Sequence, residues 1–183
     1  AKKAKPAVKK RMDILEMLRE AKYASGSRRL VVYDRHTGRL LWKRDAALNF
    51  RHNNIAVSEN TIFCIDAITE GKLKKAGAAG VAPDPRPTLH ALDLKTGVDR
   101  WRTSENVFGT FLNYSAEHDI LLQAGSKYRD RAEDDIGKGM MALRGKTGEV
   151  VWHNRELEHG GPCLLWRDRI ITNGGGGFAL ELL

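Results

Sequence analysis

The sequence predicts an all-β fold built from repeated four-stranded units. One short phrase occurs three times, at residues 32–42, 91–101 and 142–152, and in each copy a Thr-Gly pair is followed by Trp four residues after the Gly. Short apolar runs separated by turn residues surround every copy, which is the pattern of strands joined by tight turns. The composition agrees, since 18 glycines among 183 residues suit a turn-rich β chain better than a helical one.

Residues 1–27 are expected to lie outside the repeats, as a basic tail and one short helix. The lysines and the arginine ahead of Asp13 supply most of the formal net charge of +8. A basic end of this composition favours a solvated tail over a nucleic-acid surface, which would predict salt-sensitive binding lost on removal of residues 1–11. An amphipathic helix is predicted between residues 10 and 24, because apolar residues recur there at helical spacing.

From residue 28 onward the apolar runs are short enough for strands. The first phrase predicts a hairpin around a turn that ends in Gly38, and two further strands, at 55–57 and 61–65, complete a first unit of four. The second and third phrases open two more units in the same way. A fourth copy begins at residues 179–183.

Two polar insertions separate the copies. Residues 67–87 combine lysines, a run of Ala and Gly, and prolines, and residues 126–138 are similarly polar. Both are expected to be exposed loops, because such segments cannot bury enough apolar surface to order themselves. Four strands per repeat is the signature of β-propeller blades and excludes a helical solenoid. The predicted fold is therefore a partial β-propeller of about three blades plus the start of a fourth, over residues 28–183.

The repeated phrase has a structural interpretation. Gly is required where the hairpin turn needs a positive φ, and the Asp and Thr before it can bond the amides of the turn. A Trp buries a large face and still has an N–H that needs an acceptor. Trp42, Trp101 and Trp152 are therefore expected to pack against the neighbouring sheet and bond its backbone, so that each blade is held to the next.

The phrase resembles the tryptophan-docking motif A-x-D-x-x-T-G-x-x-x-W of the quinoprotein, or PQQ-like, β-propeller repeats. The first copy has Val32 in place of Ala, and the third has Arg144 and Gly145 where Asp and its neighbour are expected. The resemblance covers residues 28–183 and extends to the large PQQ-binding-like propeller proteins of environmental bacteria, especially the planctomycete type. It implies a complete propeller of about eight blades, of which this chain is a fragment, and a periplasmic or extracytoplasmic location.

The resemblance also implies PQQ with calcium as cofactor, which the residues do not support. The enzymes of the family carry a vicinal Cys-Cys pair over the quinone, and this sequence has none. Calcium requires six to eight oxygen ligands, roughly. The insertion at 126–138 holds acids, but they share it with Lys127, Arg129 and Arg131, which favours a solvated loop. These acids are Asp130, Glu133, Asp134 and Asp135. No residue is therefore assigned to catalysis, to cofactor binding or to a metal.

Two further polar clusters have a chemical and a structural interpretation. Residues 117–119, Glu-His-Asp, could supply metal ligands or an acid–base pair, but they fall where two strands of a blade must turn. Residues 52–54, His-Asn-Asn, lead into a strand and could face the central channel of the propeller. Cys64 and Cys163 could form one disulfide, although two buried thiols in strands are the favoured interpretation.

The function predicted from the sequence is that of a non-catalytic β-propeller scaffold or binding segment. Its expected partners are the remaining blades of the parent chain and a protein or glycan ligand, whereas nucleic acid is not expected. No apolar run approaches the roughly 20 residues of a transmembrane segment. The alternative is a segment of a quinoprotein dehydrogenase, or of a propeller fused to a catalytic domain.

Overall fold

A computed structural model of the protein describes residues 26–69, 71–72, 74, 78, 86–108, 111–125, 136–160, 162–173 and 179–181. These residues form twelve strands that pair throughout in antiparallel fashion. The strands are β1 (Gly26–Tyr33), β2 (Leu40–Val57), β3 (Thr61–Asp66), β4 (Thr88–Asp93), β5 (Asp99–Thr103), β6 (Phe111–Ser115), β7 (Ile120–Ala124), β8 (Met140–Arg144), β9 (Val150–Asn154), β10 (Cys163–Trp166), β11 (Arg169–Thr172) and β12 (Ala179–Glu181).

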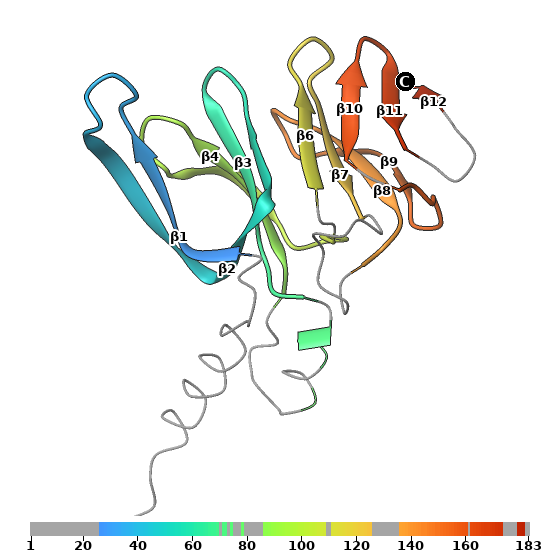
Figure 1. Ribbon diagram of the computed structural model, residues 1–183, viewed down its shortest axis with the longest axis horizontal. Coiled ribbons are helices and arrows are strands. Elements are labelled where there is room, and N and C mark those ends of the chain that lie inside the picture. The colour runs from blue at the N-terminus through green and yellow to red at the C-terminus, as the bar shows by residue number, and fades with distance from the viewer. Residues whose placement is uncertain are drawn as a thin grey trace, which may run out of the picture.

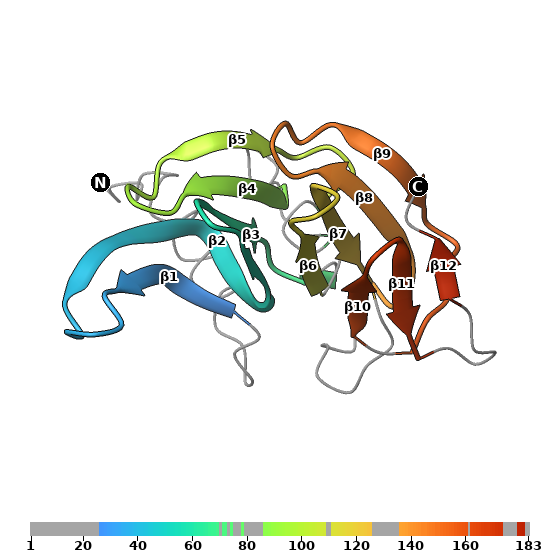
Figure 2. The same ribbon diagram turned by 90° about the horizontal axis from the view of Figure 1, so that it is seen from above.

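The strands fall into three hydrogen-bonded sheets, of order β1-β2-β3-β4-β5, β6-β7-β8-β9 and β10-β11-β12. The long strand β2 belongs to two units, because its first part pairs with β1 and its last part, at Ile55–Val57, pairs with β3. The sheets fan out like blades, with β5 and β9 along the outer side of the arc and β6 and β10 along the inner side (Figures 1 and 2). The predicted all-β propeller architecture is confirmed.

The predicted grouping of strands into units is wrong by half a blade. The second and third phrases form the last two strands of a sheet and not the first two: β4 and β5 continue the sheet of β3, and β8 and β9 continue that of β7. The reason lies in the pairing of β3, which matches β4 residue for residue from Thr61↔Asp93 to Asp66↔Thr88. The chain thus contains one hairpin, two four-stranded blades and three strands of a further blade.

The core consists of apolar layers between neighbouring sheets. Phe63 and Ile65 of β3 face the layer shared with Leu121 and Met141 of the next blade. The alternate residues of β3, Ile62 and Cys64, face the other way, toward the first hairpin. A third layer lies between β7–β8 and β10–β11. Because successive residues of a strand point to opposite faces, β3 and β7 are buried on both sides and read as continuous apolar runs.

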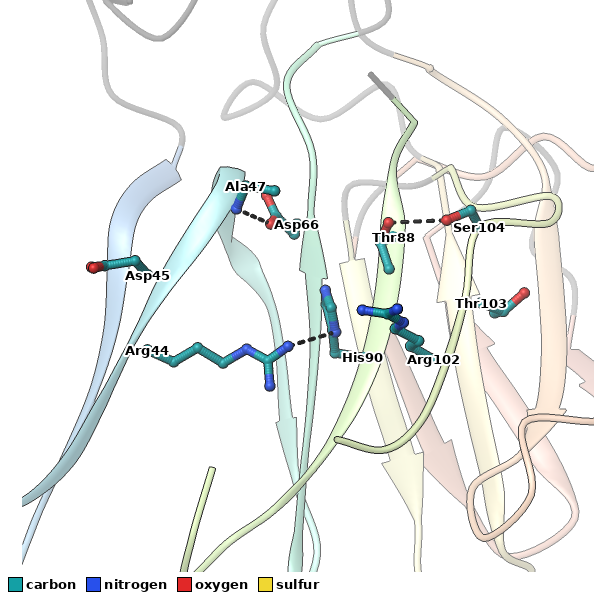
Figure 3. Close-up of a pocket in the computed structure, with 9 residues that line it drawn as sticks. All are labelled: Arg44, Asp45, Ala47, Asp66, Thr88, His90, Arg102, Thr103 and Ser104. Carbon is teal, nitrogen blue, oxygen red and sulfur yellow. Dashed lines mark hydrogen bonds between the residues drawn. The ribbon is translucent and has the colours of Figure 1, made fainter. Parts of the chain in front are cut away.

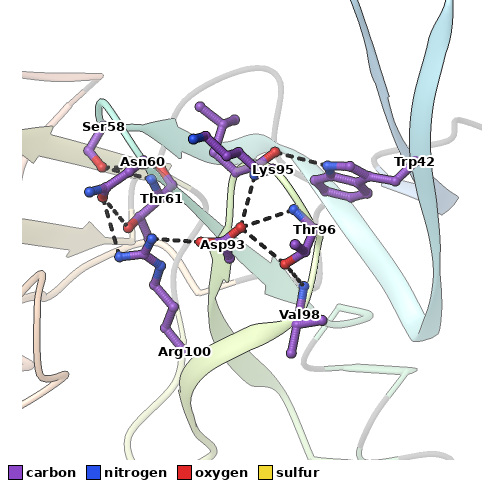
Figure 4. Close-up of polar contacts among 10 residues, drawn as sticks. Trp42, Ser58, Asn60, Thr61, Asp93, Lys95, Thr96, Val98 and Arg100 are labelled. Atoms are coloured by element: carbon purple, nitrogen blue, oxygen red, sulfur yellow. Dashed lines mark hydrogen bonds and ion pairs between the residues drawn. The ribbon is translucent and has the colours of Figure 1, made fainter.

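Two of the three tryptophans hold neighbouring units together as predicted, while Trp152 packs on the layer that includes β10 and β11 and its indole N–H has no hydrogen-bond partner among the described residues. Trp42 Nε1 donates to the carbonyl of Leu94 at 2.9 Å, and Trp101 Nε1 donates to that of Gly145 at 2.8 Å. Each indole ring also lies flat on the glycine of the next phrase, since a Cβ at Gly97 would be 2.8 Å from the Trp42 ring. Figure 4 shows Trp42 against the turn that contains Asp93 and Thr96.

The turn of the second phrase is held by Asp93. Its Oδ1 accepts hydrogen bonds from the backbone N–H groups of Lys95 and Thr96 and from the Thr96 hydroxyl, each at 3.0 Å. Its Oδ2 accepts from Arg100 at 2.6 Å (Figure 4). Asp34 holds the first turn in the same way. The carboxylate therefore replaces the missing backbone acceptors of a reversing chain.

The third phrase has Arg144 in place of this aspartate and uses a different support. Asp119, from the turn between β6 and β7, accepts from the Lys146 N–H at 3.4 Å and, through its backbone carbonyl, from the Gly145 N–H at 3.0 Å. The Tyr114 hydroxyl donates to the Asp119 carboxylate at 2.9 Å. A side chain at position 145 would collide with the Tyr114 ring, so glycine is needed there.

Several predicted segments lie partly or wholly outside the described residues, namely the tail and helix at 1–25, most of the insertion 67–87, and residues 126–135 of the second insertion. The prediction that residues 67–87 are exposed throughout is wrong at their start, because Ala67, Ile68 and Thr69 are buried. The Ala67 N–H donates to the Asn49 carbonyl at 2.8 Å, which keeps the chain paired beyond the end of β3.

Candidate functional site

A polar cavity of about 400 Å³ lies between the first hairpin and the blade of β3–β5, and is called here the inter-sheet cavity. One wall comes from β2 and the other from the start of β4 and the end of β5, with the last residue of β3 between them (Figure 3). Its lining residues are Arg44, Asp45, Ala47, Asp66, Thr88, His90, Arg102, Thr103 and Ser104.

A charged network spans this cavity. Arg44 donates to the carboxylate of Asp99 at 2.7 Å and to the carbonyl of Gly97 at 2.9 Å. His90 Nδ1 is 2.7 Å from the second oxygen of Asp99 and is itself buried. Burial alone would raise the pKa of Asp99, but the hydrogen bonds from Arg44 and His90 outweigh it, so the pKa lies below its ordinary value. Asp99 is therefore ionised at neutral pH and holds both partners in place.

The other two carboxylates of the wall are also bound. Asp66 is buried and accepts hydrogen bonds from the N–H groups of Ala47 and Leu48, at 2.6 and 2.8 Å. Asp45 forms an ion pair with Arg29 at 2.5 Å on the outer surface. Each acid near the cavity therefore has a donor from the protein.

Arg102 differs from the other charged residues of the wall. Among the described residues, no hydrogen bond or ion pair involves its guanidinium, although it follows Trp101 in β5 and lies opposite His90 in the β4–β5 register. In Figure 3 its side chain points toward His90 from the side away from Arg44. The Thr88 and Ser104 hydroxyls, 3.0 Å apart, lie at the same end of the cavity.

This network was not predicted from the sequence. A comparison of the second repeated phrase with the third could have indicated it. The positions of His90 and Asp99 in the second phrase are occupied by Met141 and Val150 in the third. An apolar pair is thus replaced by a histidine and an aspartate within an otherwise repeated pattern. The contribution of Arg44 could not be found in this way, because it comes from the preceding hairpin.

A second, smaller cavity of about 260 Å³ lies between the turn at Ser58–Thr61 and the third phrase. Tyr114 contributes to its wall, and burial together with the hydrogen bond to Asp119 raises the pKa of its hydroxyl to about 12. Lys146 also lines it. Its other polar groups hold turns of the fold: Ser58, Asn60 and Thr61 bond one another, and Arg100 bonds Asn60 and Asp93.

The two predicted clusters occupy structural positions and do not line the inter-sheet cavity. Glu117, His118 and Asp119 form the turn between β6 and β7, as expected, with Asp119 supporting the third phrase. His52 bonds the Ser27 hydroxyl at 2.8 Å at an exposed position of β2. Asn54 is fully buried within the same strand.

Both cysteines are buried free thiols, in β3 and β10 of different sheets. Burial raises the pKa of Cys64 to about 12 and also raises that of Cys163. The interpretation as two buried thiols is confirmed, and both are protonated at neutral pH. A protonated, buried thiol is a poor nucleophile.

The lining of the inter-sheet cavity does not fit calcium-bound PQQ. Calcium needs several free oxygen ligands, whereas Asp66 and Asp99 are bound to backbone N–H groups and to Arg44. Among the described residues, no group of three or more His, Cys, Asp or Glu side chains is placed to hold a metal ion. The predicted acids at 130–135 lie outside the described residues.

The fold, together with the tryptophans that bond the next repeat, defines a segment of a β-propeller with tryptophan-docking repeats. The sequence model of the family described as outer membrane protein assembly factor BamB, a PQQ-like repeat family, matches residues 20–155. The chain therefore belongs to this family of PQQ-like β-propeller proteins. A comparison with curated protein sequences gave no match.

Solved structures show the same fold at low sequence identity. BamB from Moraxella catarrhalis is 16% identical, with a TM-score of 0.52, over 85% of this chain and 41% of BamB. A europium-containing methanol dehydrogenase is 14% identical, with a TM-score of 0.58, over 86% of this chain and 37% of the enzyme. The quinohemoprotein alcohol dehydrogenase of Comamonas testosteroni is 14% identical, with a TM-score of 0.52, over 87% and 32%.

The chain thus spans less than half the length of these proteins. At such identities the likeness shows the fold alone. Within the described residues, no helix is long and apolar enough to cross a membrane.

Proposed function

We propose that the chain is part of a non-catalytic β-propeller that acts as a binding scaffold for a protein partner. The observation that carries this proposal is that the described side chains that could act as acids, bases or nucleophiles are bound within the fold or protonated. Asp99 and His90 are bound to each other and to Arg44, Asp66 is bound to the backbone, and Cys64 is a protonated thiol. These groups are fixed by the fold, which suits a rigid recognition surface better than proton transfer or nucleophilic attack.

The family supports the same proposal. The matching family model is described as an assembly factor for outer membrane proteins, which is a protein-binding role. Propeller folds arrange their blades around a central channel, and their connecting loops lie on the surface, where binding residues are concentrated. We extend the proposal to an extracytoplasmic location, which cell fractionation of the producing organism tests.

The alternative is a segment of a quinoprotein dehydrogenase, and one experiment separates the two. The complete protein is incubated with PQQ and Ca²⁺, dialysed, and assayed for dye-linked oxidation of alcohols and sugars. The binding-scaffold proposal predicts that no quinone absorbance is retained and that the dye is not reduced. Stoichiometric retention of PQQ together with substrate-dependent dye reduction would overturn it.

A further inference from the structure

We propose that the inter-sheet cavity binds a carboxylate, supplied by an aspartate or glutamate side chain of a protein partner. This inference rests on the proposed binding function and adds the chemistry of the partner. The cavity volume of about 400 Å³ is at the lower end of the range of ligand pockets and accommodates one side chain.

The distribution of charge in the cavity favours an anion near His90. Arg44 and Arg102 both lie beside this histidine, and Asp99 is the acid that bonds it. The remaining acids, Asp45 and Asp66, are satisfied by Arg29 and by backbone N–H groups. Arg44 is paired with Asp99 and Arg29 with Asp45, so Arg102 is the one arginine of the wall that lacks a paired carboxylate among the described residues.

Arg102 is the cationic group that is open to a ligand. Its guanidinium has no hydrogen bond or ion pair within the part of the chain that the structure describes, and it lines the cavity at an exposed position. A guanidinium presents a planar fork of donors that matches the two oxygens of a carboxylate. The nearby hydroxyls of Thr88 and Ser104 offer further polar contacts at the same end.

A carboxylate fits this cavity better than a phosphate. One unpaired guanidinium matches a monoanion, whereas a dianion would be repelled about twice as strongly by the carboxylates of Asp45, Asp66 and Asp99. The open position of Arg102 at the surface allows a side chain that projects from a partner to enter without rearrangement of the sheets.

The architecture of the repeats does not account for the polar lining. In the groove between the next two blades, Met141 and Val150 stand at the positions of His90 and Asp99, and both blades are still held together by the Trp101 latch. Met141 is part of the apolar layer there. The charged residues His90 and Asp99 are therefore specific to one groove. Because the fold does not require them there, they can serve to bind a partner.

The test measures the binding of N-acetylglutamate amide to the complete protein by saturation-transfer NMR, with N-acetylglutamine amide as the neutral matched probe. We expect the acid to bind saturably with an affinity in the millimolar range. The amide is expected to bind at least about tenfold more weakly. The Arg102→Gln variant is expected to lose about tenfold in affinity. The Arg39→Gln variant removes a charge from an exposed turn outside the cavity and is expected to bind as the wild type does.

Four outcomes would overturn the proposal: no saturable binding, equal affinity for the acid and the amide, equal affinity in wild type and Arg102→Gln, or tighter binding of inorganic phosphate. Tighter binding of free glutarate than of the peptide-like probe would assign the cavity to a small acid and not to a protein side chain. These results are independent of the PQQ assay, since a non-catalytic scaffold can lack this site and a dehydrogenase can contain it.

Discussion

Gly97 and Gly148 are subject to two constraints, whereas Gly38 is subject to one. All three have positive φ values, of 71°, 76° and 69°. A Cβ at Gly97 or Gly148 would also lie within 3 Å of a tryptophan ring, while nothing lies within 4 Å of the corresponding point at Gly38. The contact between the tryptophan and the next turn therefore needs glycine for space as well as for backbone conformation.

This difference predicts unequal effects of alanine at equivalent positions. Gly38→Ala is expected to cost about 1–2 kcal/mol, the penalty of a positive φ for a residue with a Cβ. Gly148→Ala is expected to cost at least about 1 kcal/mol more, because the Trp101 ring must also move. Urea denaturation of both variants of the 183-residue chain measures the two losses. Equal losses would mean that the ring does not rest on Gly148.

Trp101 itself is expected to make a large contribution to stability. Trp101→Ala removes the ring contact with Phe63 and Gly148 and the hydrogen bond to Gly145, and is expected to cost about 3–5 kcal/mol. Val98→Ala is the control, because that residue is 63% exposed and the change should alter stability by less than about 0.5 kcal/mol. A loss below about 1 kcal/mol for Trp101→Ala would show that it does not connect the blades.

The carboxylate of Asp93 gives a pH dependence with a defined sign. The hydrogen bonds from Arg100 and Thr96 lower its pKa to about 2 in the folded chain, below the ordinary value of 3.8. Its stabilising contribution is therefore present above about pH 4 and is lost as the pH falls toward about 2. The difference in free energy of unfolding between wild type and Asp93→Asn should be constant near neutral pH and shrink over that acidic range. Denaturation curves that keep a constant difference down to pH 2 would contradict this assignment.

At the scale of elements, the strands β3 and β4 serve two layers at once. Cys64 and Leu92 pack toward the first hairpin, while Phe63 and Ala91 pack toward the next blade. His90 lies on the hairpin side of β4, where it is held in the charged network with Asp99 and Arg44. The network thus replaces part of an apolar layer between the hairpin and the blade.

Replacing this network by the residues of the next groove tests whether it serves stability. The triple variant Arg44→Thr, His90→Met and Asp99→Val copies Thr103, Met141 and Val150. We expect its free energy of unfolding to match or exceed that of the wild type, because a partly buried ion pair is often no better than apolar packing. Arg44→Ala alone is the comparison, and it should be less stable than the wild type because Asp99 loses a cation. A triple variant several kcal/mol less stable would show that the network is needed for the fold.

At the scale of the whole molecule, the fan of sheets ends in two exposed apolar faces. Val31, Tyr33 and Leu41 are exposed on the first hairpin. Leu164 and Ile171, which pair across β10 and β11, are exposed with Trp166 on the last sheet. In closed propellers such faces are covered by the adjacent blades. Uncovered, they favour association with another apolar surface.

The 183-residue chain by itself is therefore expected to self-associate in a concentration-dependent way. The double variant Leu164→Lys and Trp166→Ser should shift it toward monomer, because charge and polarity replace the apolar face of the last sheet. Val98→Lys, which changes an exposed apolar residue in a turn away from both faces, should have no effect. Sedimentation velocity measures the distribution, and a wild-type chain that stays monomeric at high concentration would contradict the expectation.

The fold was largely predictable because its information is local and repeated. The Thr-Gly turn requires a positive φ, and the spacing to Trp places the indole on the strand after the turn. Both constraints depend on residues close together in the sequence. The family resemblance followed from the same phrase. The error in grouping the strands arose because a strand can pair with either neighbour, and the sequence of β3 does not show which one it joins.

The strands, the hairpin turns and the tryptophans that hold neighbouring units together could all be predicted from local patterns of residues. The tertiary structure decided which sheet each phrase belongs to, how Asp119 replaces the missing aspartate of the third phrase, and that Arg44 meets His90 and Asp99 across a groove. The physical reason is distance along the chain. Arg44 and Asp99 are brought to 2.7 Å by the packing of one hairpin on the next blade, which no local pattern records. The candidate site is therefore a product of packing between repeats.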